Sequence, residues 1–594
     1  MKCLVCNEGH KLKFTIVDGH LSNLKKHKCF SAIEEQKALE STTGDTISTT
    51  AATSVQTTLD GGLVHGPKLP EDVQKKITHA LLKFLIVDGR PLFITESKTF
   101  RNFCYILNPR YRPPCVETLE SYVDKLLLTG TSGLKTFVNS LSAFSFTSDL
   151  YLTENHVHLI FIFLHYIQGA QRKKLLLASH DTSALPHVDA KALEQIFVKT
   201  MNDFNLKKEK LVAFTADGGS NLIKLVEKHL QIPYLHCIPH VVNLIVQAAI
   251  DIPEVNELRM KMRSVVSFFH CSTLGFSVLT ANQIDDNKLR KLDNVVYALI
   301  MEVATRRDSF YDMIDRIHLV FEQVNDALKE CKREDLVMTP LTKEIIEELM
   351  EVLKPFKIIS KEFQGDPTPL LSMIIPSFRS VELQLKNLNL MSTTAIKLRN
   401  QCADNLVHYA KEYKTNSLVL IGNYLDPRTR SFNTYSFEKE MVSSFKTSAI
   451  SAVKGAISQF PIDNQSSPTA VDQQRSSSHC AHSLEYLFDN IHVDQVVNSQ
   501  SESDLEKEMK EYESEQVNFR FDDEIQRYWA LKSTSSRLLS KLAFRIFSVP
   551  SSAVICEQEG SKARRICQNR AKLKGSTVCK LLFLQEHFPP KKYT

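Results

Sequence analysis

One stretch, residues 211–225, constrains the fold of this chain more than any other part of the sequence. An apolar run that ends at Phe214 leads to Asp217 and a pair of glycines, and a helical pattern then opens at Ser220 or Asn221. Apolar runs of this length form buried strands, and glycine permits the tight turn that follows. The stretch therefore predicts a strand that delivers a carboxylate to the edge of a sheet, or an aspartate that only shapes the turn.

The surrounding residues, 142–250, alternate apolar strand patterns with amphipathic helical patterns. The predicted strands are Phe144–Leu150, His156–Tyr166, Leu175–Ala178 and Leu211–Thr215, and a predicted helix, Val188–Phe204, separates the last two. Three consecutive strands followed by helix, strand and helix is the order of a ribonuclease H-like core. Asp149 lies near the end of the first strand and Asp217 after the fourth, so neighbouring strands would bring these two carboxylates to one sheet edge.

Three separate segments resemble the transposases of the hAT superfamily and the host proteins derived from them. The string Thr215-Ala-Asp-Gly-Gly-Ser-Asn, followed by Cys237 and His240, resembles the paired motifs T-x-D-x-x-S-N and C-x-x-H-x-x-N-L. Residues 87–114 resemble the string D-x-x-P-F … L-x-P-x-Y-x-x-P, and residues 547–558 resemble S-x-P-x-S-S-x-x-S-E-R-x-F-S. The resemblance runs with gaps from about residue 76 to residue 587.

The resemblance implies an α+β multidomain protein. Its ribonuclease H-like α/β core would be interrupted by a large all-helical insertion, and a small zinc finger would precede it. The implied boundaries are 1–30 for a BED-like zinc finger, 31–72 for a disordered linker, 73–140 for a helical DNA-binding or dimerising segment, 141–250 for the first part of the core, 251–461 for the helical insertion, 462–520 for a disordered acidic and serine-rich segment, and 521–590 for a C-terminal dimerisation region that completes the core.

The same resemblance implies a DNA transposase site. Asp149, Asp217 and Glu557 would hold two Mg²⁺ ions, one activating the attacking oxygen and the other stabilising the leaving oxygen during strand cleavage and transfer. A second possibility is a host-recruited nuclear protein that binds DNA and has lost catalysis. Departures from the family pattern favour it: Tyr151 replaces a tryptophan, Gln558 replaces an arginine, Arg307 replaces a tryptophan, and Thr429 replaces an aromatic residue.

Two cysteine and histidine groups suggest metal binding. Cys3, Cys6, His27 and Cys29 form a Cys₃His set suited to tetrahedral Zn²⁺, and the string Ser22-Asn-Leu-Lys-Lys-His resembles the helix of BED-type fingers. The alternative is a truncated finger, and His20 is another candidate ligand. Cys237 and His240 are too few for a structural zinc site; the family resemblance implies a role in DNA transactions, and the other interpretation is a buried cysteine with a capping histidine.

Basic residues and bulk composition bear on partners. The family resemblance favours DNA contacts at Arg306 and Arg307, and a cationic run after the third carboxylate is a candidate phosphate track, or else a solvated helix face: Lys562, Arg564, Arg565, Arg570, Lys572 and Lys574. The net charge of +5 is too small to indicate nucleic acid by itself. Thirteen cysteines without a repeating framework suggest a reducing compartment. The family resemblance implies a nuclear, self-associating protein, and no apolar run approaches the length needed for a membrane segment.

Overall fold

The computed structural model describes residues 69–169, 171–185, 187–290, 295–303, 308–364, 371–432, 437–459, 501–516, 525–568 and 573–587, together with the backbone of 16–17 and 20–21. The chain divides into two compact units, 1–68 with 105–110, and 69–104 with 111–594. In the first unit, β1 (Ile16–Val17) pairs antiparallel with β2 (His20–Leu21). The predicted zinc ligands Cys3, Cys6, His27 and Cys29 lie outside the described residues.

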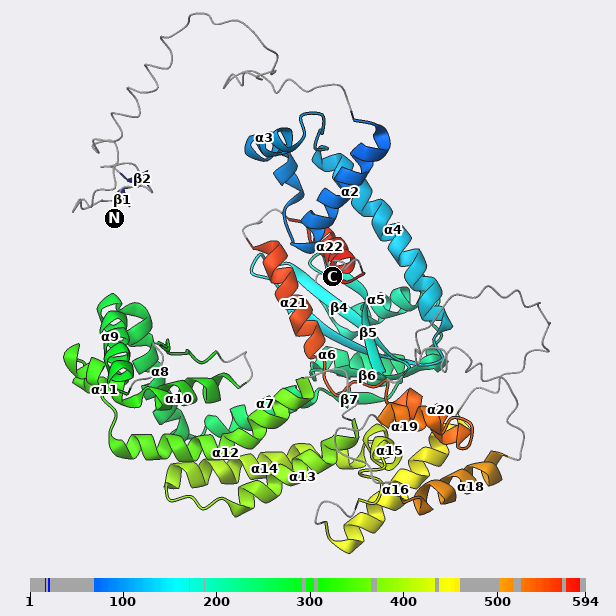
Figure 1. Ribbon diagram of the computed structural model, residues 1–594. Coiled ribbons are helices and arrows are strands. Elements are labelled where there is room, and N and C mark those ends of the chain that lie inside the picture. Colours follow the sequence, from blue (N-terminus) through cyan, green and yellow to red (C-terminus); the bar gives the residue numbers. More distant parts are fainter. Residues whose placement is uncertain are drawn as a thin grey trace, which may run out of the picture. The chain divides into compact units, whose positions relative to one another are not determined.

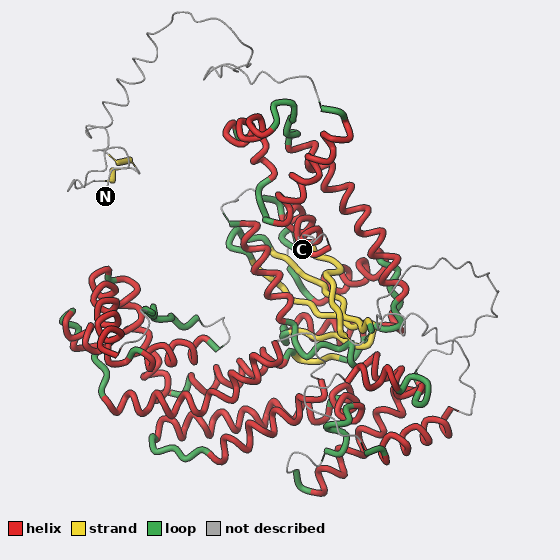
Figure 2. The backbone as a smooth tube through the Cα atoms, viewed as in Figure 1, coloured by secondary structure: helices red, strands yellow, loops and turns green. Residues whose placement is uncertain are grey.

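A five-stranded mixed sheet forms the centre of the second unit (Figure 1; yellow in Figure 2). Its order is β5-β4-β3-β6-β7, with the first three strands antiparallel and the last two parallel to β3. The strands are β3 (Phe144–Leu152), β4 (His158–Gln168), β5 (Gln171–Asp181), β6 (Leu211–Ala216) and β7 (Tyr234–His236).

The observed strands follow the predicted succession along the chain, with three main differences. β5 covers Gln171–Asp181, where only Leu175–Ala178 was predicted. β3 continues to Leu152 because its pairing with β4 extends to that residue, so Asp149 lies inside the strand rather than at its end. β7 was not predicted from the sequence, because a three-residue strand is too short to show alternation. It pairs with β6 through Ala216 and His236, and this pairing brings His236 beside the Asp217 turn.

Helices cover both faces of the sheet, and the alternation along β4 explains why (Figure 1). Phe161 and Phe163 belong to a core shared with α2 (Glu71–Val87), α4 (Val116–Ser140), α21 (Val554–Cys567) and α22 (Gly575–His587). Ile160 and Ile162 point into a second core, which contains α5 (Ala190–Asp203), α6 (Ser220–Lys224) and the π-helical turn η4 (Leu225–Leu230). Successive residues of a strand face opposite sides, so a strand covered on both sides is apolar throughout.

The rest of the described chain is helical (red in Figure 2), and a third core unites most of it. The region between β7 and residue 459 contains α7 (Ile238–Ile250), α8 (Pro253–Cys271), α9 (Thr273–Arg290), α10 (Ser309–Leu319), α11 (Phe321–Glu330), η5 (Glu334–Leu336), α12 (Pro340–Gln364), η6 (Leu371–Met373), α13 (Ile374–Asn387), α14 (Thr393–Thr415), α15 (Ser417–Leu425) and α16 (Lys439–Ser458). The remaining elements are η2 (Leu92–Glu96), α3 (Lys98–Leu107), η3 (Lys208–Lys210), α18 (Ser501–Ser514), α19 (Ile525–Leu531) and α20 (Arg537–Ile546). The protein is thus mixed α/β and mostly helical.

The turn after α15 joins the helical insertion to the C-terminal region. The buried carboxylate of Asp426 accepts hydrogen bonds from Arg428 Nε (2.9 Å) and from Ser372 Oγ (2.6 Å). Trp529 of α19 donates from Nε1 to the carbonyl of Leu425 (2.8 Å). The Leu-Asp-Pro-Arg string at 425–428 is therefore a structural turn that fixes α19 against α15.

The helix α18 differs from the sequence prediction, which placed residues 462–520 in a disordered segment. Its acidic sequence carries Leu505, Met509 and Tyr512 on one face, and all three are buried. Their spacing of four and three residues is helical, but the surrounding charges hid this pattern. Residues 461–500 and 517–520 lie outside the described part of the chain. Across the described ranges, no single helix is long and apolar enough to cross a membrane.

Candidate metal centre at the sheet edge

The parallel register of β3 and β6 positions the two predicted aspartates. Thr147 is the partner of Thr215 across these strands. Asp149 follows two residues later within β3, and Asp217 follows two residues later in the turn just after β6, so both lie beyond the same paired position of these strands. Neighbouring strands are about 4.8 Å apart. The fold therefore brings Asp149 and Asp217 together, and both are half-buried.

The side chain of each aspartate also accepts a hydrogen bond from a backbone amide one or two residues later. Asp149 Oδ1 accepts from the amide of Leu150 (2.7 Å), and Asp217 Oδ1 accepts from the amide of Gly219 (3.1 Å). The second contact closes an Asx-type turn after β6. These bonds orient the carboxylates, and they are also what a purely turn-forming aspartate would make.

Residues 548–553, here called the returning segment, bring the C-terminal region back to this sheet. Ser548 Oγ lies 3.0 Å from Ser145 Oγ of β3, and Arg172 of β5 donates from Nη1 to the carbonyl of Val549 (3.1 Å). Ser145, Ser548 and Arg172 are all buried. Strands far apart in the sequence therefore anchor the start of the segment.

The second half of the returning segment is bound beside the aspartates. Thr215 of β6 donates from Oγ1 to the carbonyl of Pro550 (2.8 Å), and the amide of Ile238 donates to the carbonyl of Ser551 (3.0 Å). The amide of Ala553 donates to the sulfur of Cys237 (3.3 Å). The backbone of this serine- and proline-containing motif is thus held by hydrogen bonds to β6 and to the start of α7.

Helix α21 begins directly after the returning segment and packs against β3 (Figure 1). The Cys556 sulfur lies 3.8 Å from Thr147 Oγ1, on the face of β3 that also carries Asp149. Burial, and then the nearby charge of Asp149, raise the pKa of the Cys556 thiol well above its usual value. This thiol therefore stays protonated. Glu557 is the next residue, in the first turn of α21, and is exposed.

The donor set at this edge suits a hard cation. Carboxylate oxygens are the ligands that Mg²⁺ prefers. Within the described residues, which include Asp149, Asp217 and Glu557, no three His, Cys, Asp or Glu side chains are grouped so as to hold a metal ion. The structure brings the two aspartates together and puts Glu557 on the helix that packs against the same strand.

Cys237 and His240 lie at the start of α7, next to the same edge. Cys237 is the N-cap residue, is 1% exposed, and accepts the hydrogen bond from Ala553. His240 lies in the first turn of the helix and is half-buried. Cys237 therefore has a packing role that holds the returning segment.

Three residues surround the Asp217 turn: Gly218, which belongs to the glycine pair noted in the sequence, and His236 and Glu412, to which the sequence assigned no role. Gly218 has φ +94°, and a Cβ atom at this position would lie 2.0 Å from His236 Nε2. His236 Nδ1 is 3.3 Å from Oε2 of Glu412, which comes from α14. The glycine after Asp217 was the sequence signal for this turn. Nothing in the sequence pointed to Glu412, because it is 176 residues from His236 along the chain.

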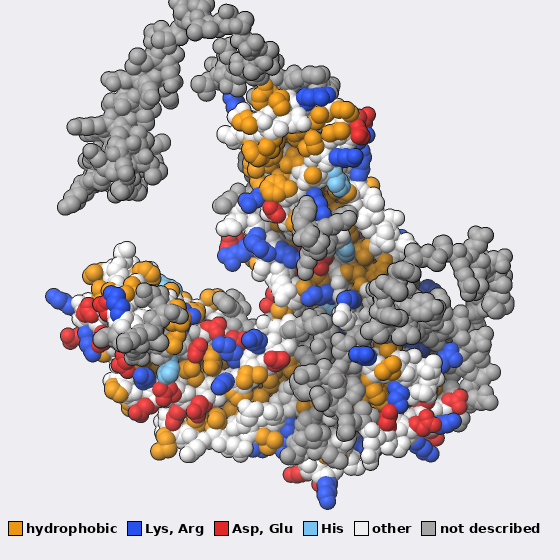
Figure 3. All heavy atoms as spheres, in the orientation of Figure 1, with side chains coloured by type: hydrophobic (Ala, Val, Ile, Leu, Met, Phe, Trp, Pro, Cys, Tyr) orange, Lys and Arg blue, Asp and Glu red, His pale blue; other side chains and the backbone are white. Residues whose placement is uncertain are grey.

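The predicted basic residues have different environments. Lys562 Nζ lies between two carboxylates, 2.8 Å from Glu559 Oε2 and 3.0 Å from Glu586 Oε2. Arg564 is exposed and forms an ion pair with Glu154, and Arg565 is exposed. Basic side chains gather at this end of α21 in Figure 3. Lys562 therefore connects α21 to α22, and the exposed members of the run that the structure describes are Arg564, Arg565 and Lys574. Arg306, Arg307 and Arg570 lie outside the described residues.

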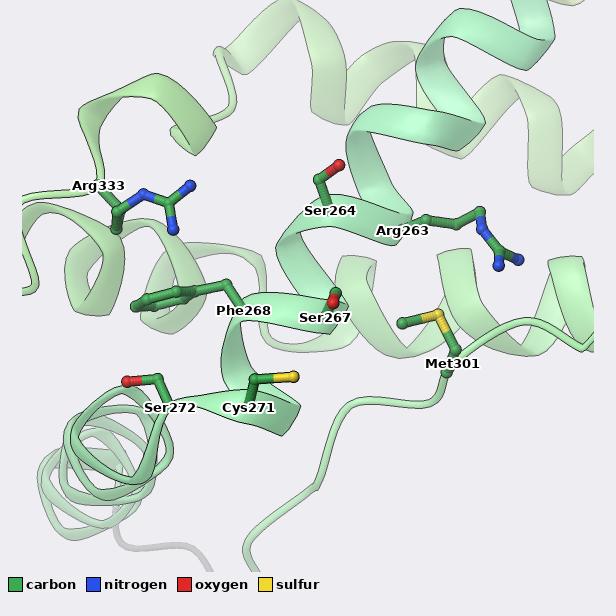
Figure 4. Close-up of a pocket in the computed structure, with 8 residues that line it drawn as sticks. All are labelled: Arg263, Ser264, Ser267, Phe268, Cys271, Ser272, Met301 and Arg333. Carbon is green, nitrogen blue, oxygen red and sulfur yellow. The ribbon is translucent and has the colours of Figure 1, made fainter.

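A separate cavity of about 570 Å³ lies in the helical insertion (Figure 4). One face of α8 lines it, together with Met301 and Arg333, and the Arg333 guanidinium lies 4.9 Å above the Phe268 ring. Asp335 binds Arg333 through two hydrogen bonds (2.8 and 2.7 Å), and Arg263 bonds to Glu302 (3.1 Å). Carboxylates therefore balance both guanidinium charges, so the cavity is not a cationic site.

Comparison with known proteins identifies the C-terminal region. Residues 508–588 match the hAT family C-terminal dimerisation region. This part of the chain is a hAT dimerisation region. It comprises the end of α18, helices α19 to α22 and the returning segment, so the same residues that match the family also contact β3, β5 and β6.

Two relatives extend the similarity beyond the dimerisation region. The chain is 21% identical over 554 residues to zinc finger BED domain-containing protein RICESLEEPER 3 of Oryza sativa subsp. japonica, an alignment that covers 87% of this chain and 71% of the relative. It is 21% identical over 546 residues to zinc finger BED domain-containing protein 4 of Homo sapiens, covering 87% of this chain and 44% of that protein. The chain thus spans less than half of the human relative. These matches confirm the resemblance to hAT-derived proteins.

Proposed function

We propose that this protein is a hAT transposase-like protein that binds DNA as a self-associated assembly and cleaves it at a two-Mg²⁺ site. The site would lie on a ribonuclease H-like core and would use Asp149, Asp217 and Glu557. The dimerisation region supports self-association. The three antiparallel strands followed by two parallel strands support the assignment of the core.

The returning segment is the observation that carries this proposal. Its bonds to Ser145, Arg172 and Thr215 hold residues from near position 550 against strands that begin near position 144. As a result, α21 with Glu557 packs against the strand that carries Asp149. If Asp149 and Asp217 only formed turns, the C-terminal region would not need to pack against their strands.

In this proposal each acidic residue has a defined role. Asp149 on β3 and Asp217 in the turn after β6 would hold the shared metal position, and Glu557 would approach from the first turn of α21. When bound, the paired metal ions would activate the attacking oxygen and stabilise the leaving oxygen. Arg564 and Arg565 would contact the phosphate backbone near the end of α21.

A nicking assay tests catalysis directly. The full chain is incubated with Mg²⁺ and a terminal-repeat DNA duplex, and wild type is compared with Asp217→Asn. We expect the wild type to nick the DNA and the variant to lose at least about 100-fold in rate, because the amide removes the charge that binds the cation. Equal nicking by both proteins would rule out the proposed site.

We also propose that the N-terminal residues Cys3, Cys6, His27 and Cys29 bind Zn²⁺ and that this finger contacts DNA in the nucleus. The printed names of both relatives include a BED-type zinc finger, which supports this assignment. Retention on a DNA column during a salt gradient tests it. We expect Cys3→Ser to elute at lower salt than wild type. Unchanged elution would favour a zinc-dependent protein-interaction adaptor with no DNA role.

A second candidate is a non-catalytic protein that retains the scaffold for DNA or protein binding. The backbone hydrogen bonds of Asp149 and Asp217 favour it, because a structural aspartate makes the same contacts. The ion pairs of Lys562 also assign part of the basic run to folding. DNA retention by wild type without metal-dependent nicking would select this candidate.

A further inference from the structure

The imidazole of His236 packs directly on the turn that follows Asp217. His236 is the last residue of β7 and pairs with Ala216, the last residue of β6. The atom nearest to a Cβ built on Gly218 is His236 Nε2, at 2.0 Å, and the next is His236 Cδ2, at 2.8 Å. The ring therefore occupies the space where any other residue at position 218 would carry its side chain.

Glu412 of α14 holds the other edge of this ring. Its Oε2 lies 3.3 Å from His236 Nδ1, and the His236 side chain is only 16% exposed. The carboxylate accepts, so Nδ1 carries the proton in this contact. A carboxylate behind a histidine fixes both the tautomer and the orientation of the ring.

The same end of α14 holds β7 at two more points. Tyr413 donates from Oη to the carbonyl of His236 (3.1 Å), and Asn416 donates from Nδ2 to the carbonyl of Tyr234 (3.0 Å). Tyr234 in turn donates from Oη to the carbonyl of Ala216 (3.2 Å). The helical insertion is thereby connected to both strands on which the Asp217 turn depends.

We propose that His236, oriented by Glu412, is a positioning residue for the Asp217 carboxylate, and that this pair couples the helical insertion to the metal site. The inference rests on the proposed Mg²⁺ site. His236 Nε2 is the atom nearest to a Cβ built on Gly218, so in this proposal the ring acts on the carboxylate through the turn. Its effect is to keep Gly218 and Asp217 in the conformation that directs the carboxylate toward Asp149.

Binding of Mn²⁺ to the full chain, followed by electron paramagnetic resonance, tests the proposal. Changes behind a ligand typically weaken metal binding by about 10- to 100-fold. We expect Glu412→Ala and His236→Ala each to raise the Kd for Mn²⁺ about tenfold, while Glu412→Gln, which keeps an acceptor for Nδ1, stays within about threefold of wild type. A merely structural contact would change the melting temperature, but the Kd for Mn²⁺ would not rise in Glu412→Ala and return toward the wild-type value in Glu412→Gln.

Glu347→Ala is the matched control. Glu347 accepts from His318 at 2.8 Å, so it forms a similar histidine–carboxylate pair in the helical insertion. We expect it to leave the Mn²⁺ affinity unchanged. If Asp217→Asn weakens Mn²⁺ binding but Glu412→Ala does not, the positioning role is wrong and the metal site stands. If Asp217→Asn has no effect, the metal site itself is wrong, and the inference falls with it.

Discussion

At the scale of residues, two glycines allow rings from the sheet to pack against other elements. A Cβ on Gly218 would lie 2.0 Å from the His236 ring, and a Cβ on Gly560 would lie 2.3 Å from the Tyr151 ring. Tyr151 stands where the family motif has tryptophan. The ring of Tyr151 therefore lies directly against the backbone of α21 at Gly560.

Gly218→Ala should destabilise the fold by about 1–3 kcal/mol, because its φ of +94° is unfavourable for alanine and its Cβ would meet His236. Urea unfolding of the full chain measures the change. The control is Gly455→Ala, since nothing lies within 4 Å of a Cβ there and alanine favours the helix. An unchanged midpoint for Gly218→Ala would contradict the close packing of His236.

The buried carboxyl of Glu559 makes stability depend on pH. Burial raises its pKa, and the nearby Lys562 offsets this only in part. Lys562 itself has a raised pKa, because its two carboxylate partners outweigh its own burial. A group with a raised folded-state pKa contributes stability that is present below its unfolded pKa and lost as pH rises through the folded pKa.

Glu559→Gln should therefore become more stable relative to wild type as the pH rises above about 4.5, the usual value for this carboxyl. The amide carries no charge that burial can penalise. Unfolding free energies of both proteins, measured from pH 4 to pH 8, give the comparison. Parallel curves across this range would mean that the carboxyl is not desolvated in the folded protein.

At the scale of elements, the returning segment joins parts of the chain that are about 400 residues apart in sequence. Its contacts include hydrogen bonds from buried side chains to backbone carbonyls, which would otherwise lack partners. Because α21 follows the returning segment directly, these hydrogen bonds also fix the position of α21. The contacts of Cys237 and Ile238 extend the same arrangement to α7.

A double-mutant cycle on Ser145→Ala and Ser548→Ala measures one of these contacts. The two hydroxyls lie 3.0 Å apart and are buried, so we expect a coupling free energy of about 1 kcal/mol. Thermal or urea unfolding provides the four values. Additive effects of the two substitutions would show that the hydroxyls do not interact in solution.

At the scale of the whole molecule, the dimerisation region is also part of the core of a single chain. Leu581, Leu582, Phe583 and Leu584 of α22 are all buried within one chain. Among the large apolar side chains that the structure describes between 508 and 588, Leu531 is 74% exposed. The apolar end of α22 thus stabilises the sheet layer, and surface residues must supply contacts between subunits.

Leu582→Ala should cost about 2–5 kcal/mol of stability, because it removes a fully buried side chain from the core that α22 shares with β4. Leu531→Ala, at an exposed position, should leave the melting temperature almost unchanged. Scanning calorimetry, with sedimentation analysis of the same samples, separates folding from self-association. Loss of self-association by Leu582→Ala at full thermal stability would contradict this division of roles.

The sequence alone determined the succession of strands β3 to β6 along the chain, the helical character of most of the remainder and the resemblance to hAT proteins. Apolar periodicity is a local property, so it predicted β4, β5 and β6 within a few residues and missed β7, which is too short to show it. It also missed α18, where charges surround three buried residues. The motifs around Asp217 and Glu557 were visible because they are contiguous in the chain.

Only the tertiary structure decided how these motifs meet. The register of β3 against β6 pairs Thr147 with Thr215, each two residues before an aspartate, and the returning segment brings α21 to β3. Glu412 is a surface residue of a helix by its sequence, and Lys562 is one member of a basic run. Packing makes the first a partner of His236 and the second a link between Glu559 and Glu586. Contacts between residues hundreds of positions apart depend on how whole layers pack, which local patterns do not record.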